Sequence, residues 1–123
     1  MKLHWTMPSK IRPHYLAELN MSEQAHSIGD LRLEWHHLER AHILAQRWPR
    51  EHNGVHWRML KFGLRIKDTR EIIGQVPRLV FGGVKRFVGT VPIGNTGGSN
   101  VPALKSMVVP PDLAEVLKGC AVG

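Results

Sequence analysis

The sequence has 123 residues, of which 42% are hydrophobic, and it includes four tryptophans. A chain of this kind can bury a modest core without disulfides or a structural metal, which excludes wholesale disorder. Lys and Arg outnumber Asp and Glu by seventeen to ten, for a formal net charge of +7. The basic residues are scattered, however, and no nucleic-acid fold signature is present, so we expect no nucleic-acid partner.

The sequence contains a single cysteine, Cys120, which excludes an intrachain disulfide and a zinc cage built from cysteines. Residues 1–15 lack the apolar core of a signal peptide, and no apolar run is long enough to span a membrane. These features predict a cytoplasmic protein that forms one domain over residues 1–123, alone or as a small oligomer such as a homodimer.

Two helices are predicted in the first part of the chain. Pro13 suits the first turn of a helix that continues to a stop at Gly29. Asp30 is a candidate N-cap for the second helix. The apolar face of this second helix recurs at steps of three and four residues, through Leu31, Trp35, Leu38, His42 and Ala45.

Trp48-Pro49 interrupts this pattern, because a residue before proline is disfavoured in the α region. A third helix is predicted after the turn, to about Lys67, running back along the second. The Asn53-Gly54 pair lies inside it, and the glycine weakens a helix by about 1 kcal/mol relative to alanine.

Asp68 can cap a fourth helix over residues 68–89, which Gly74, Pro77 and the paired glycines at 82 and 83 should kink or divide. Residues 12–88 would then form the bundle and residues 89–123 an extended tail with a short last helix, DLAEVLKG. No alternating strand pair is evident. The prediction is an all-α protein, a small bundle of about four helices built on a helix-turn-helix hairpin.

The tail contains GNTGG at residues 94–98, where glycines permit positive φ and close approach of the backbone to a ligand. The Lys-Ser/Thr pair of a phosphate-binding Walker loop does not follow it. Asn95, Thr96 and Gly97 are therefore candidates for a ligand or partner loop. The alternative is a tail that turns sharply to pack over the bundle.

Five of the eight histidines fall between Glu34 and His56. His42 precedes Pro49 by seven residues and His56 follows it by seven, so the two should face each other across an antiparallel helix pair. Glu39 and His52 lie on the same two helical faces, three and four residues from these histidines. Three imidazoles and one carboxylate would suit zinc, nickel, copper or iron.

Two other interpretations of the histidines remain open. They could form a hydrogen-bonded core network in a protein-protein interaction module, because Glu-x-x-His also occurs by chance elsewhere in the chain. Adding Glu18 and Glu71 would resemble a ferritin-like dinuclear carboxylate oxidase, although the third helix lacks the required glutamate. No serine has nucleophile-elbow spacing and Cys120 is close to the end of the sequence, so no catalytic residue is assigned.

HLERAH at residues 37–42, His52-x-x-x-His56 followed by WRML, and GNTGG with VPPDL downstream resemble a small bacterial family, domain of unknown function 3703. The resemblance extends from about Arg12 to Leu117. It implies a short, free-standing protein, of a kind that tends to be encoded near heavy-metal resistance and transport functions. It implies no activity, but it points to His42, His52 and His56, with Glu39, as the matching positions for metal handling or stress response.

Overall fold

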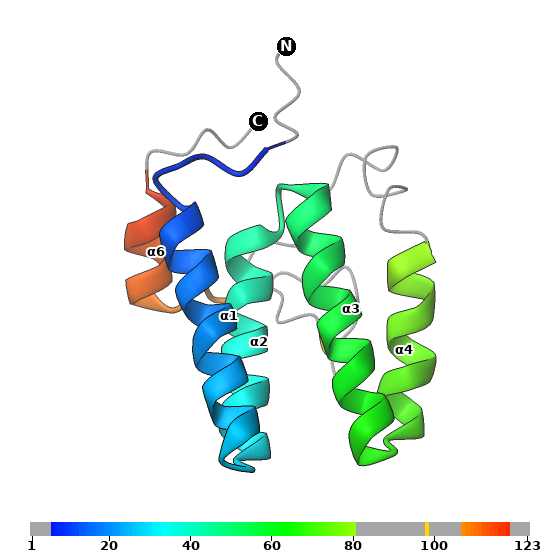
Figure 1. The fold of residues 1–123 in the computed structure, drawn as a ribbon. Helices are drawn as coiled ribbons and strands as arrows, with labels where there is room; N and C mark the ends of the chain where they lie inside the picture. The colour runs from blue at the N-terminus through cyan, green and yellow to red at the C-terminus, as the bar shows by residue number, and fades with distance from the viewer. Residues whose placement is uncertain (1–5, 81–97, 99–106, 119–123) are drawn as a thin grey trace.

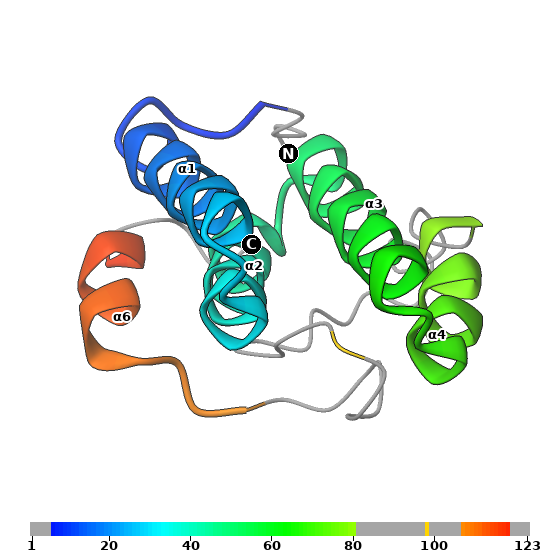
Figure 2. The ribbon, with the colours of Figure 1, turned by 60° about the horizontal axis from the view of Figure 1, so that its bottom comes forward.

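A computed structural model describes residues 6–80, 98 and 107–118 of the chain, and every secondary-structure element within these residues is a helix. Figure 1 shows two antiparallel helical hairpins standing side by side, α1 with α2 and α3 with α4. The four helices span Arg12–Ser27, Leu31–Ala45, Pro49–Ile66 and Thr69–Val80. A short helix, α6 (Pro111–Leu117), packs against α2 on the far side from α3 (Figure 2). The all-α prediction is confirmed.

The local signals at the α1–α2 turn act as predicted. Pro13 lies in the first turn of α1, and Gly29 follows the helix with a positive φ of 75°, which glycine adopts without strain. Asp30 then caps α2, because its Oδ1 accepts a hydrogen bond of 3.0 Å from the backbone N–H of Leu33.

The turn at Trp48-Pro49 is also confirmed. Trp48 has an extended conformation, with φ −117° and ψ 104°, and Pro49 is the first residue of α3. The helix then continues through Asn53-Gly54 without a break, so the expected weak point does not interrupt it. A Cβ atom built on Gly54 would lie 3.6 Å from the Tyr15 hydroxyl, in ordinary contact.

Lys67 ends α3 in the left-handed conformation, with φ 57°, and reverses the chain into α4. Asp68 caps α4 by accepting a hydrogen bond of 3.1 Å from the N–H of Glu71. The described part of α4 runs through Gly74 and Pro77 as one helix, so the division expected there is not observed. The remainder of the predicted 68–89 segment lies outside the described residues.

The core lies between the hairpins and beneath α6, and includes Ile11, Leu38, Leu44, Val55, Met59 and Leu113. Leu31 is the exception on the predicted apolar face of α2, since it is half exposed at the start of the helix.

Arg40 joins α6 to the bundle through Asp112, and this hydrogen bond holds the pKa of Asp112 below its usual value. No described helix is both long enough and apolar enough to cross a bilayer.

Candidate metal centre

The side chains of His42, His52 and His56 converge at the turn between α2 and α3. His42 lies in the last turn of α2, while His52 and His56 lie four residues apart near the start of α3. The short Trp48-Pro49 turn places these two helix ends against each other, and all three side chains are at most 3% exposed. Among the described residues they form a group of potential metal ligands without any carboxylate.

Their Nε2 atoms form a nearly equilateral triangle. The distances are 2.9 Å between His42 and His52, 3.1 Å between His42 and His56, and 3.1 Å between His52 and His56. The rings are tilted against one another by 53° to 88° rather than stacked, so their edges point inward. A zinc ion bound tetrahedrally would separate such nitrogens by about 3.3 Å, so small ring rotations would accommodate it.

Hydrogen bonds alone cannot satisfy this triangle. In a neutral imidazole, each ring nitrogen either carries a hydrogen or offers a lone pair. A favourable contact pairs one N–H with one lone pair. Three Nε2 atoms that all contact one another cannot all be paired in this way. At least one pair therefore brings together two hydrogens or two lone pairs, which is costly for buried groups. One cation accepting three lone pairs would remove that conflict.

Gln75 of α4 determines which nitrogen of His56 faces the triangle. The Gln75 amide nitrogen donates to Glu71 Oε2 over 2.9 Å, and the carboxylate can only accept. The amide oxygen therefore points to His56, where it accepts a hydrogen bond of 2.6 Å from Nδ1. With its hydrogen on Nδ1, neutral His56 presents the Nε2 lone pair, the form that binds metal.

The relay from Glu71 through Gln75 to His56 is buried, with Gln75 fully inaccessible. Glu71 is one of the two additional carboxylates predicted from the sequence, whereas Gln75 is not among the predicted site residues. The sequence does contain a pattern that could have indicated Gln75, because Glu71 and Gln75 are four residues apart on one face of the fourth helix. That spacing does not reveal which helix the face contacts, so the pairing with His56 comes only from the fold.

Two of the remaining candidate residues, Glu39 and Glu18, are described but do not belong to the group of converging ligand atoms. Glu39 is partly buried on α2. The carboxylate of Glu18 pairs instead with Arg40 Nε at 2.9 Å and His37 Nδ1 at 2.8 Å, where α1 contacts α2. Asn95, Thr96 and Gly97 lie outside the described residues.

The fold and the site define a class: a small helical bundle in which three buried histidines meet at the turn between two helices. The chain belongs to the family described as protein of unknown function (DUF3703), whose model matches residues 9–117. No curated protein and no solved structure matches the chain.

Proposed function

We propose that this protein binds one divalent transition-metal ion through the Nε2 atoms of His42, His52 and His56 and serves metal handling or stress response. The observation that carries the proposal is the Nε2 triangle, with no side longer than 3.1 Å. Such close contacts between buried imidazoles are unfavourable when unsatisfied but suit a shared ion. Neutral imidazoles favour zinc, copper, nickel or iron over calcium or magnesium.

Gln75 and Glu71 support this proposal as orienting residues. Histidine ligands commonly donate their other ring N–H to an oxygen acceptor, which holds the tautomer and increases the basicity of the bound nitrogen. Gln75 fills that role for His56, and Glu71 holds the Gln75 amide in the required orientation.

Three protein ligands leave a coordination position for water or an exchangeable ligand, unlike the closed four-ligand sites of structural zinc. Glu39, one helical turn before His42, is proposed as an orienting residue or a fourth ligand. A ferritin-like dinuclear oxidase is less favoured, because other partners hold both carboxylates. Glu18 forms an ion pair with Arg40 and a hydrogen bond with His37, and Glu71 accepts a hydrogen bond from Gln75.

The direct test is the metal content of the protein purified without a histidine tag. We expect close to one equivalent of a transition metal by plasma mass spectrometry, directly or after incubation with zinc, copper, nickel or iron followed by desalting. The His42→Ala, His56→Ala double variant should lose it. The matched control is the His14→Ala, His36→Ala double variant, because both of these histidines are exposed.

Retention of metal by the first double variant, or no uptake of any of the four ions by the wild-type protein, would refute the metal site. The histidines would then be structural, as in the interaction-module hypothesis.

A further inference from the structure

A second polar site lies between α1, α2 and α3 and includes none of the three clustered histidines. It is a cleft of about 480 Å³, within the range of about 300–1,000 Å³ that is typical of small-molecule sites. Leu38 and Leu64 contribute apolar surface to its lining. The cleft is therefore separate from the candidate metal centre.

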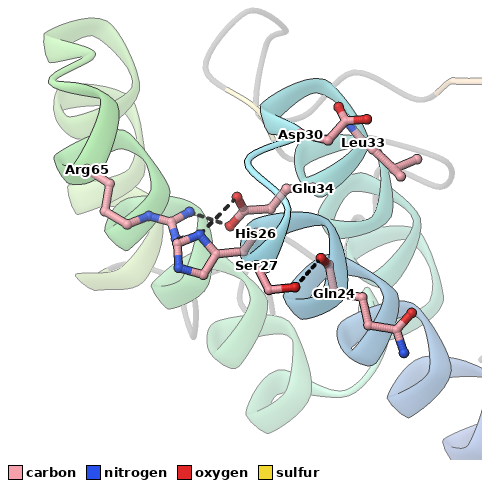
Figure 3. A network of polar contacts seen from close by, with 7 residues as sticks. All are labelled: Gln24, His26, Ser27, Asp30, Leu33, Glu34 and Arg65. Atoms are coloured by element: carbon pink, nitrogen blue, oxygen red, sulfur yellow. Dashed lines mark hydrogen bonds and ion pairs between the residues drawn. The ribbon is translucent and has the colours of Figure 1, made fainter.

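Two arginines of α3 form ion pairs across the cleft. Arg58 binds Glu23 of α1, with 3.0 Å between the guanidinium and the carboxylate. Arg65, seven residues further along α3, binds Glu34 of α2 and donates to Nδ1 of His26 over 2.8 Å (Figure 3). Both carboxylates that line the cleft are thus already paired with arginine.

Lys61 lies on α3 between these two arginines, three residues after the first and four before the second, and it also lines the cleft. Its ammonium group has no ion-pair partner within the described residues. Ser22 of α1 lines the cleft as well, is only 3% exposed, and has no hydrogen-bond partner in the same part of the chain. The polar groups that a ligand can reach are therefore an ammonium and a hydroxyl beside two leucines. Glu34 Oε1 also has no hydrogen-bond partner, but this oxygen is buried.

From this arrangement we propose that the cleft binds a small organic anion with an apolar body. The acidic group, a carboxylate or phosphate ester, pairs with Lys61 and accepts a hydrogen bond from Ser22, while the apolar part covers Leu38 and Leu64. The charges favour an anion, because Arg58, Lys61 and Arg65 outnumber the two glutamates of the lining. A cationic ligand is disfavoured, because Glu23 is already paired with Arg58 and the one oxygen of Glu34 without a hydrogen-bond partner is buried.

The experiment uses octanoate as the probe, with acetate and neutral octanamide as comparisons, in isothermal titration and amide chemical-shift measurements. Octanoate should bind saturably, at least tenfold more tightly than either comparison, because only it combines charge with an apolar body. The shifts should centre on Ser22, Leu38 and Leu64. Phosphate esters of matched chain length then distinguish the two acid groups.

Lys61→Gln should weaken octanoate binding at least tenfold, and this exposed substitution should leave the fold intact. Arg32→Gln removes the same charge from an exposed position outside the cleft and should have no effect. Equal binding of octanoate by both variants, or shifts scattered over the surface, would overturn the proposal. The result should be the same with chelator and with zinc, so it does not depend on the metal site.

Discussion

His56 donates from Nδ1 to Gln75 Oε1 over 2.6 Å, which connects the three-histidine cluster to α4. Gln75→Met keeps the length of the side chain but removes the acceptor, so His56 loses the partner that selects its metal-binding tautomer. We predict that zinc affinity falls by about 10–100-fold, measured by competition with a chromophoric chelator. Ile73→Met, on the exposed side of the same helix, is the control and should leave the affinity unchanged.

His42→Leu separates a metal site from a structural histidine network. Without His42, the remaining Nε2 atoms of His52 and His56 can form one N–H···N hydrogen bond across their 3.1 Å distance. When a chelator keeps the protein free of metal, the free energy of unfolding of the His42→Leu variant should therefore stay within about 1 kcal/mol of the wild-type value. With zinc at a hundred times the wild-type Kd, only wild type should gain about 2.7 kcal/mol.

Urea denaturation with and without zinc measures both quantities. A loss of about 1–3 kcal/mol in chelator, with no gain from zinc in either protein, would instead support the structural network.

Gly63 sets how closely α4 packs against α3. A Cβ atom at this position would lie 3.2 Å from the Cβ of Glu71 and 3.5 Å from Cγ1 of Ile72. Gly63→Val should force α4 outward and destabilise the protein by about 1–3 kcal/mol, with weaker zinc binding because Gln75 moves with the helix.

Gly54→Ala is the matched control in α3, since its new Cβ would meet only the Tyr15 hydroxyl at 3.6 Å. It should stabilise the protein by up to about 1 kcal/mol. If Gly63→Val is as stable as wild type, α4 does not depend on this close approach.

Tyr15 makes stability sensitive to alkaline pH. Burial raises the pKa of its hydroxyl, which also donates to the backbone oxygen of Glu51 over 3.2 Å. The folded state therefore retains this proton at a pH where the unfolded chain has lost it. The contribution is complete below the unfolded pKa of about 10 and declines above it, by at most about 1.4 kcal/mol per pH unit.

Urea denaturation of wild type and Tyr15→Phe between pH 8 and pH 11 tests this prediction. The variant should be less stable by about 1 kcal/mol at pH 8, because it lacks the hydrogen bond, and its stability should fall less steeply with pH. Parallel curves would show that Tyr15 does not cause the decline.

The sequence by itself determined the helices and the turns that join them. Asp30, Pro49 and Asp68 act on the backbone within a few residues of their own positions, and such local effects do not depend on the rest of the chain. The opposing positions of His42 and His56 about Pro49 were predictable for the same reason, because a short turn leaves the two helices little freedom.

Only the tertiary structure decided which side chains complete the site. Gln75 reaches His56 because α3 and α4 approach closely at Gly63, and Glu18 pairs with Arg40 because α1 packs on α2. These contacts join residues 19 and 22 positions apart in the chain. Helical periodicity shows which face carries a residue, but which faces meet depends on the packing of the whole bundle.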